Sequence, residues 1–515
     1  MHLDRLAETW MAVAATRSRN TKRDLLAAAL AAAGPGDLEI AVCYLGGGLR
    51  QRRTGLGWRG LAELPTAAAE PTLTLTEVDA AFAMMADLSG SGSTTRRNEL
   101  AADLFRRATE REQAFLRGLV LGDLRQGAMD ALVQEGMARA YGVDPAVLRR
   151  AAMLLSSTTQ AAHLLVTGGA DALAAVGLTV GIPVQPMLAA SAPDPESALD
   201  KIGAPAYVDV KLDGIRVQVH RNGEDVRIFT RSLDDITNRL PEIVESVRDI
   251  PVTELVLDGE VLALRDDGRP EAFQLVASRT ATRSADIGGD LALRVFFFDL
   301  LHVDGRTLLD EPLTARVAEL DRVVPPQLRV EQALVSTASE LTTAFDSAVA
   351  RGFEGVVVKR PDAGYAAGRR QASWIKVKPR HTFDLLVTGV EWGYGRREGW
   401  LSNIHLAARD PSSGEPIMLG KTFKGMTDEL LRWQTEHFSA ISTRREGHVV
   451  YVEPITVVEI ACDGLQTSTR YPGGVALRFA RVLRYRPDKR PDEADTLDEV
   501  KRLLGPAVDA PDDAD

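Results

Sequence analysis

The sequence is poor in cysteine, in aromatic residues and in long hydrophobic runs. Its 515 residues include only two cysteines, Cys43 and Cys462, which excludes a disulfide framework and a four-cysteine zinc site. The longest uniformly apolar run, residues 25–33, is much shorter than the roughly 20 residues that span a bilayer. The N-terminus has no basic segment followed by an apolar one, the pattern of a secretory signal. These absences predict a cytoplasmic protein without membrane contacts.

The sequence also lacks the net positive charge that many nucleic-acid-binding proteins carry. Its formal net charge is −11, but a polyanion responds to the surface within a Debye length, about 8 to 10 Å, rather than to the total. Pairs of adjacent arginines are present, such as Arg96-Arg97 and Arg106-Arg107. Each pair alone is more typical of a solvated helix face. Charge therefore neither predicts nor excludes a nucleic-acid partner.

What the sequence does contain is three successive hydrophobic patterns, which predict a multidomain fold. Residues 1–178 have helical periodicity and predict an all-α N-terminal domain, with helical segments at 21–33, 96–119, 128–141 and 145–166. Residues 179–380 mix strands with helices, including a hairpin at Asn222-Gly223, and predict an α+β domain. Residues 381–504 are mostly strands with turn spacings typical of a small β-barrel. Residues 505–515 are acidic and predict a disordered tail.

The most informative segment is Asp209-Val-Lys211-Leu-Asp213-Gly214-Ile-Arg216, in which a lysine ends a short apolar strand just before the hairpin. A lysine amine is a nucleophile only when uncharged, and nearby cations and partial desolvation favour that form. Lys376 and Lys378 alternate along a predicted strand, so their side chains share a face that could bind phosphates. Gly214 would let a ligand approach the backbone closely. Alone, the segment is as typical of an exposed lysine before a turn.

Further segments follow the lysine in a fixed order. They are Thr230-Arg231-Ser232, Leu257-Asp258-Gly259-Glu260, Phe298-Asp299-Leu300, Glu354-Gly-Val-Val-Val-Lys359, Trp374-Ile-Lys376-Val-Lys378, and Arg478-Phe-Ala480-Arg481 running into Arg484-Tyr-Arg486-Pro-Asp488-Lys489. Together with Gly122–Ala128 and Pro183–Ala189, this order resembles the ATP-dependent DNA ligases of the nucleotidyltransferase superfamily, in the bacterial type with an N-terminal DNA-binding domain. The resemblance implies a helical DNA-binding domain, an adenylation domain at 179–380 and an OB-fold β-barrel.

The resemblance also implies a role for individual residues. Lys211 would be catalytic, attacking the α-phosphate of ATP to form a lysyl-AMP intermediate. Nucleotide contacts would come from Asp209 and Phe298 on the adenine, Arg216, Arg231 and Glu260 around the ribose, and Arg370, Lys376, Lys378 and Arg486 on phosphates. Glu260 and Glu354 would bind Mg²⁺ or another divalent cation, since carboxylates and phosphates suit magnesium.

The implied reaction is the sealing of single-strand nicks in duplex DNA, between a 3′-hydroxyl and a 5′-phosphate, in DNA replication, repair or recombination. We expect a monomer that binds nicked double-stranded DNA. Two departures from the family pattern affect positioning rather than charge: Asp209 stands where glutamate is frequent, and Ala480 where proline is frequent.

Alternative interpretations remain open from the residues themselves. Without the resemblance, Phe298 would be a core strand residue, Glu260 and Glu354 solvated carboxylates, and Lys376 with Lys378 guards of an edge strand. An RNA ligase or a capping enzyme would share the lysine chemistry, but the long helical N-terminal region disfavours both. An NAD-dependent ligase is disfavoured because a cysteine zinc site is lacking. A catalytically inactive DNA-binding scaffold would have no reason to keep the carboxylates and lysines.

Overall fold

The computed structural model describes residues 1–51, 54–61, 63–124, 130–281, 291–366, 370–394 and 397–504, and the chain forms two compact units. The first unit comprises Met1–Ala190, Leu212–Gln332 and Arg360–Trp374. The second comprises Ser191–Lys211, Ala333–Lys359 and the chain from Ile375 onward. The predicted acidic tail, residues 505–515, lies outside the described residues, as do residues 125–128 of the Gly122–Ala128 segment.

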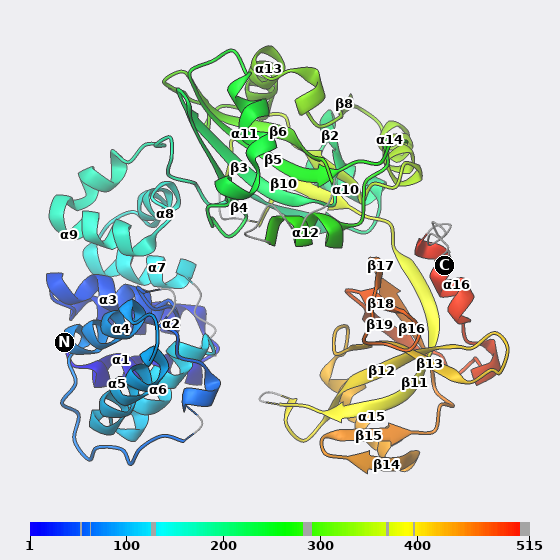
Figure 1. Cartoon of the computed structure of the whole chain (residues 1–515), viewed down its shortest axis with the longest axis horizontal. Helices are drawn as coiled ribbons and strands as arrows, with labels where there is room; N and C mark the ends of the chain where they lie inside the picture. The colour runs from blue at the N-terminus through cyan, green and yellow to red at the C-terminus, as the bar shows by residue number, and fades with distance from the viewer. Residues whose placement is uncertain are drawn as a thin grey trace. The chain divides into compact units, whose positions relative to one another are not determined.

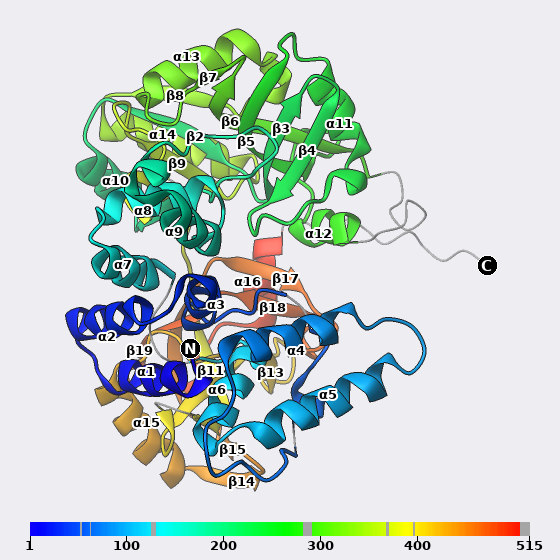
Figure 2. The ribbon, with the colours of Figure 1, turned by 90° about the vertical axis from the view of Figure 1, so that its left-hand side faces the viewer.

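The N-terminal part of the first unit is helical, as the periodicity predicts. Its helices share one hydrophobic core, and α1 packs against α2, α3 and α6 (Figure 2). Their bounds are α1 Leu3–Ala15, α2 Arg19–Ala31, α3 Pro35–Leu45, α4 Leu75–Asp87, α5 Ser93–Arg107, α6 Glu110–Leu121, α7 Asp130–Tyr141, α8 Pro145–Leu154 and α9 Thr158–Ala174.

Two of the predicted helical segments were wrong in extent, because each is divided by a helix cap. The segment 96–119 is two helices, since Thr109 and Glu112 form a reciprocal capping box that starts α6. The segment 145–166 is likewise divided, because the Ser157 side chain accepts from the Gln160 amide and starts α9. The T-x-x-E spacing of the first cap was visible in the sequence.

The remainder of the first unit contains an antiparallel sheet of order β4-β3-β5-β6-β7 (green in Figure 1). The Asn222-Gly223 hairpin is confirmed: β3 and β4 are antiparallel with Asn222 opposite Asp225, and Gly223 has a φ of 59°. Buried residues of the strands pack with those of the helices in one core. The bounds are β3 Ile215–Asn222, β4 Asp225–Thr230, β5 Glu254–Ala263, β6 Leu293–Val303 and β7 Arg306–Thr307, with α11 Pro241–Arg248, α12 Phe273–Ala281 and α13 Leu313–Val323.

The second sheet has the order β1-β10-β9-β2-β8 and carries the lysine segment. The antiparallel ladder between β2 and β9 sets Lys211 opposite Gly355 and Asp209 opposite Val357. The helices α10 and α14 pack against β9, and α14 also against β2. The bounds are β1 Leu188–Ala192, β2 Ala206–Lys211, β8 Gln332–Val335, β9 Gly355–Lys359, β10 Arg370–Val377, α10 Pro195–Ile202 and α14 Ala338–Ala350.

The C-terminal part of the second unit is rich in strands, as predicted, and has its own core. Its main sheet has the order β13-β12-β11-β15-β14, and β16 pairs with both β11 and β19. Within the described residues these ladders do not close into a hydrogen-bonded barrel, because β17 and β18 pair only with each other. The bounds are β11 His381–Trp392, β12 Leu401–Arg409, β13 Pro416–Thr422, α15 Asp428–Ala440, β14 Ser442–Glu446, β15 Val449–Val452, β16 Val457–Cys462, β17 Gly464–Thr467, β18 Val475–Arg478, β19 Arg481–Tyr485 and α16 Leu497–Lys501.

No helix among the described residues has the length and apolar character needed to cross a membrane.

Candidate active site

Lys211 and Glu354 form an ion pair at the end of β2. The Lys211 Nζ lies 2.5 Å from Oε2 of Glu354, and the two side chains are 22% and 15% exposed. The β2–β9 ladder sets this pairing, because Glu354 directly precedes β9 and its backbone N–H donates to the Lys211 carbonyl at 3.0 Å. The lysine is therefore held on a sheet rather than on a loop, with part of its side chain still open to solvent.

The same carboxylate also binds Lys378, which follows the last residue of β10. The Lys378 Nζ donates to Oε1 of Glu354 and lies 3.3 Å from Oδ2 of Asp463. Burial alone would lower the pKa of Lys378, but the Glu354 and Asp463 carboxylates outweigh it, and the pKa lies above its usual value. Lys378 is therefore a fixed ammonium, and Glu354 bridges it to Lys211.

Close packing beside Glu354 requires a glycine. Gly355 has a φ of 127°, and a Cβ there would come within 2.2 Å of the Val377 carbonyl oxygen. The absence of a side chain lets β10 approach β9, which brings Lys378 to Glu354. Gly214 likewise packs closely within the chain, because a Cβ there would meet the Val261 carbonyl oxygen at 2.2 Å, while its close approach to a ligand stays a prediction.

Asp209 lies two residues before Lys211 and is buried in an ion pair with Lys359. Only 2% of Asp209 and 1% of Lys359 are exposed, and the β2–β9 ladder brings the two together. Removing one member of a buried pair leaves the other charge unpaired, which costs about 3 to 5 kcal/mol. The pair therefore fixes β2 against β9 behind the catalytic candidate.

Arg216, on β3 in the first unit, is clamped by Asp258 of β5. Its Nε and Nη2 donate to the two Asp258 oxygens at 3.0 and 2.6 Å, and its Nη1 donates to the Met187 carbonyl at 2.6 Å. The Tyr365 hydroxyl donates to Asp258 at 2.7 Å and accepts from the Met187 amide at 3.0 Å. Burial alone would lower the pKa of Arg216, but the Asp258 carboxylate outweighs burial and the pKa lies above its usual value. The guanidinium therefore stays charged.

Aromatic rings gather around the same guanidinium. The Arg216 Cζ lies 5.5 Å from the Phe298 ring centre and 5.8 Å from that of Trp374. The Phe298 and Trp374 rings meet edge to face with centroids 5.9 Å apart. In the run of three phenylalanines, Phe297 is fully buried whereas Phe298 is only half-buried, so Phe297 and not Phe298 is the core residue. Phe298 therefore presents an aromatic surface beside a charged arginine.

The orientation of β6, which carries Phe298, depends on a buried ion pair at the next residue. Arg316 of α13 donates to both oxygens of Asp299, from Nε at 2.7 Å and from Nη2 at 3.1 Å, and both side chains are fully buried. Arg316 also donates to the carbonyls of Glu311 and Ala363. One guanidinium thus joins β6 to the segment that carries Tyr365.

Other predicted site residues have more modest surroundings. Glu260, opposite Arg216 in the β3–β5 ladder, accepts from the Gly214 amide at 3.2 Å. Arg231 is exposed in the turn after β4. Lys376 is half-buried on the face of β10 opposite to the buried Ile375 and Val377. The Arg370 side chain lies outside the described residues.

Comparisons with known proteins decide the family. Three family models match the chain. The model described as "ATP dependent DNA ligase domain" matches residues 186–378, "ATP dependent DNA ligase C terminal region" matches residues 397–489, and "DNA ligase N terminus" matches residues 62–138. A "Probable DNA ligase" of Beutenbergia cavernae is 58% identical over 513 residues, covering 98% of this chain and 100% of the relative. The chain belongs to the ATP-dependent DNA ligase family. The resemblance and the enzyme class inferred from the sequence are thereby confirmed.

Further relatives agree with this family. A "Probable DNA ligase" of Streptomyces griseus is 53% identical over 509 residues, covering 97% of this chain and 99% of the relative. The solved structure described as "Pmar-Lig_Pre." is 19% identical, with a TM-score of 0.66 over 94% of this chain and 99% of that chain. At that identity the structural likeness speaks for the fold alone, and it confirms the helical, nucleotidyltransferase and β-rich order.

The carboxylates of the ligase fit a divalent cation only in company with phosphate. Among the described residues, no group of three or more histidine, cysteine, aspartate or glutamate side chains could hold a metal ion. Glu354 is bound by two lysines and Glu260 by an amide. Magnesium is commonly held by one or two carboxylates together with substrate phosphates and water, so each glutamate fits as one ligand of such an ion.

The ligase's C-terminal arginine candidate is neutralised by its own domain. The Arg486 Nη1 donates to Asp384 at 3.0 Å, and its Nη2 donates to Asp488 at 2.7 Å. Lys489 also donates to Asp384, at 2.6 Å. To take the phosphate-binding role that the resemblance implies, Arg486 would have to exchange these carboxylates for phosphate oxygens.

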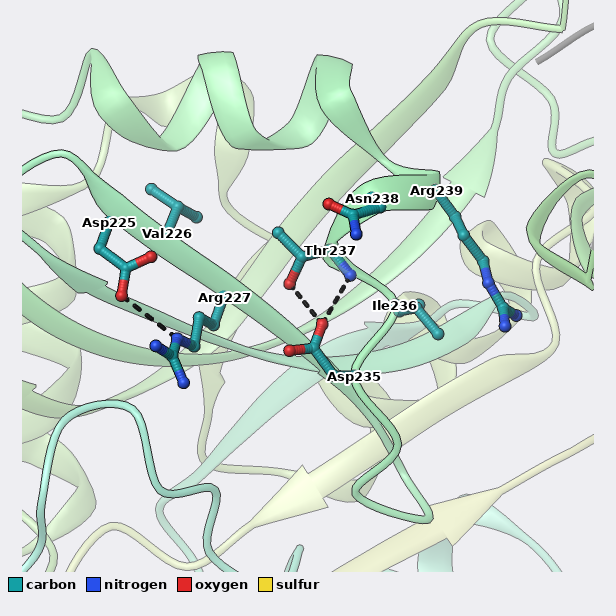
Figure 3. Close-up of a pocket in the computed structure, with 8 residues that line it drawn as sticks. All are labelled: Asp225, Val226, Arg227, Asp235, Ile236, Thr237, Asn238 and Arg239. Carbon is teal, nitrogen blue, oxygen red and sulfur yellow. Dashed lines mark hydrogen bonds and ion pairs between the residues drawn. The ribbon is translucent and has the colours of Figure 1, made fainter. Parts of the chain in front are cut away.

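A pocket of about 610 Å³ beside β4 was not predicted from the sequence. It is lined by residues 225–227 and 235–239, and Figure 3 shows Asp225 paired with Arg227 and Asp235 bound to Thr237. Two arginines and two aspartates line it, so their formal charges balance.

Sequence reasoning named the lysines and arginines but assigned no role to several of their partners. Asp258 and Lys359 stand inside the quoted segments, and Asp258 shares a strand face with Glu260, which could have predicted its contact with Arg216. Tyr365 and Asp463 stand in segments without a recognisable pattern. Their positions depend on long-range packing.

Proposed function

We propose that Lys211 is the nucleophile of a nick-sealing reaction in three nucleotidyl transfers. The Lys211 nitrogen bonds to the α-phosphorus of ATP, and the bond from that phosphorus to pyrophosphate breaks. The AMP group then moves to the 5′-phosphate of a nick, and the 3′-hydroxyl displaces AMP to form the phosphodiester. The observation that carries this proposal is the Lys211–Glu354–Lys378 arrangement, in which one carboxylate lies between the proposed nucleophilic amine and a second cation.

The lysine has to lose a proton before it attacks. Glu354 forms an ion pair with the amine and would accept that proton. Lys378 keeps its positive charge, which attracts the phosphate oxygens of the nucleotide. Lys376, two residues before Lys378, would add a second cation for the phosphates. Catalysis would rest mainly on such charge placement.

Residues of β3, β5 and β6 would supply contacts to the nucleoside. Phe298 offers an aromatic face for the adenine, and Arg216, held by Asp258 and Tyr365, would donate to the ribose with Glu260 and Arg231 nearby. Because Asp209 is buried in its pair with Lys359, its contact with the adenine would have to form at the edge of that pair. Arg370 and Arg486 would bind phosphates.

A divalent cation would be held by Glu354 and Glu260 with phosphate oxygens, and Mg²⁺ is the natural candidate. Such an ion, when bound, neutralises charge on the phosphates. The ligase residues alone orient the amine and accept its proton.

We propose domain limits of 1–178 for a helical DNA-binding domain, 179–380 for the adenylation domain and 381–504 for the OB-fold domain. The hydrophobic core shared by the N-terminal helices and the separate core of the C-terminal strands support this division. Nicked duplex DNA would be bound mainly through its phosphates, so affinity would fall steeply with salt. We further propose that the ligase acts as a monomer in the cytoplasm. Both of these predictions rest on the sequence.

The proposal is tested with two labelled nicked duplexes, one with a 5′-phosphate and one with a 5′-adenylate already attached. We expect wild-type protein to seal both, the first only with ATP. Lys211→Ala should fail on the first and still seal the second without ATP, because the last transfer needs no lysyl-AMP. Sealing of the 5′-phosphate nick by Lys211→Ala would contradict the assignment.

A further inference from the structure

A carboxylate of the C-terminal β domain reaches the lysine that is proposed to grip the nucleotide phosphates. The Asp463 Oδ2 lies 3.3 Å from the Lys378 Nζ, and the two side chains are 42% and 19% exposed. Asp463 lies between β16 and β17, and none of the roles discussed so far involves it. Its contact with Lys378 therefore needs an explanation of its own.

The position of Asp463 follows from the register of two strands. His381 begins β11 and stands opposite Cys462, the last residue of β16. Lys378 precedes His381 by three residues, and Asp463 follows Cys462 directly, so the ladder holds the carboxylate beside the chain that leaves β10. The Asp463 backbone N–H also donates to the Arg478 carbonyl at 3.0 Å, which fixes that turn.

The contact places the Lys378 ammonium between two carboxylates, Glu354 and Asp463. An ammonium has three N–H donors, and a phosphate oxygen that takes one of them would lie close to the Asp463 carboxylate. Two anions competing for one cation repel each other. A phosphate that binds Lys378 would therefore compete with Asp463 for the ammonium.

We propose that Asp463 is a positioning residue that competes with the phosphates of ATP for Lys378. The proposal rests on the phosphate-binding role given above to Lys378. The β domain thereby lowers the affinity of the adenylation step for ATP, and the nucleotide must displace Asp463 as it binds. Because the Asp463 side chain is nearly half exposed, water screens the contact and the effect is modest.

The test is the ATP dependence of Lys211 adenylation in the full chain, measured with labelled ATP. We expect Asp463→Asn to lower the KM for ATP about two- to five-fold, the range that an exposed ion pair contributes, with kcat unchanged. Asp463→Glu keeps the charge and should retain the wild-type KM. Glu446→Gln, which alters an exposed carboxylate paired with Arg444 in the same domain, is the matched control and should also leave KM unchanged.

An unchanged or raised KM in Asp463→Asn would overturn the proposal, as would a lowered KM in Asp463→Glu. Lys378→Ala distinguishes the phosphate-binding role of Lys378 from the competition by Asp463. If Lys378→Ala raises the KM and Asp463→Asn does not lower it, the competition is wrong while the phosphate role stands. If Lys378→Ala leaves adenylation unchanged, the phosphate role fails and the competition fails with it.

Discussion

Glu354 binds Lys211 through one carboxylate oxygen, at 2.5 Å, and Lys378 through the other. This bridge joins the proposed nucleophile to the proposed phosphate clamp with a single side chain. Both lysines need the carboxylate for different reasons, since one must lose a proton and the other must keep its charge. Glu354 is therefore the residue on which the lysine chemistry most depends after Lys211 itself.

Replacing Glu354 by glutamine should slow lysine adenylation about a hundredfold or more, the scale of losing a positioned proton acceptor. The amide can still accept hydrogen bonds but cannot take the proton. The rate is measured by single-turnover labelling with ATP, and circular dichroism checks the fold. Glu245→Gln, on the exposed face of α11, is the control. Labelling at the wild-type rate in Glu354→Gln would remove the proton-acceptor role.

Asp258→Asn should weaken ATP binding more than Tyr365→Phe does. The first change leaves the buried Arg216 charge without its bidentate partner, which costs about 3 to 5 kcal/mol. The second removes one hydroxyl and leaves the Met187 N–H unsatisfied, which costs about 1 to 3 kcal/mol. The KM for ATP in adenylation and the urea unfolding midpoint report the two effects. A larger loss of ATP binding in Tyr365→Phe than in Asp258→Asn would mean that Asp258 does not hold the arginine.

Arg316→Ala should lower the free energy of unfolding by about 3 to 5 kcal/mol, because it leaves Asp299 charged and fully buried. Arg306→Ala is the contrast, since its pair with Glu319 is 57% exposed on the arginine side and contributes less than about 1 kcal/mol. Urea unfolding followed by tryptophan fluorescence measures both. Equal effects of the two substitutions would show that burial does not govern the Asp299 pair.

Because of His220, the free energy of unfolding of the ligase should decrease as the pH falls below neutral. Burial lowers the pKa of His220 to about 3, whereas an unfolded histidine titrates near 6.5. Its Nδ1 accepts from the Gly181 amide at 3.0 Å, so the folded state requires the neutral ring. Since the unfolded chain binds the proton first, the stability present above about pH 6.5 is lost progressively as the pH falls toward 3.

Urea unfolding at several pH values between 7 and 5 tests this prediction. His220→Gln cannot be protonated, so its unfolding free energy should decline less steeply with falling pH than that of the wild type. Parallel declines for the two proteins would contradict a buried neutral histidine.

Local patterns in the sequence predicted most of the elements, whereas the roles of the site residues came from the order of the motifs and its resemblance to the ligase family. The Asn-Gly turn, the alternation of Lys376 and Lys378, and the lysine at the end of β2 follow from rules that act over a few residues. The helix α15 and the sheet that remains open within the described residues did not follow, because turn spacing does not determine which strands pair. The partners of the site residues were also missed, since Tyr365 and Asp463 reach them through packing across long sequence separations.

The central claim, that the Lys211 amine takes AMP from ATP, is tested most directly by incubating the protein with a divalent cation and each α-labelled nucleotide before a denaturing gel. We predict label from ATP on the wild type and none on Lys211→Ala. Mass spectrometry of the labelled peptide should find the adduct on residue 211. Label from GTP, label that persists in Lys211→Ala, or a wild type that takes no label from ATP would contradict the account.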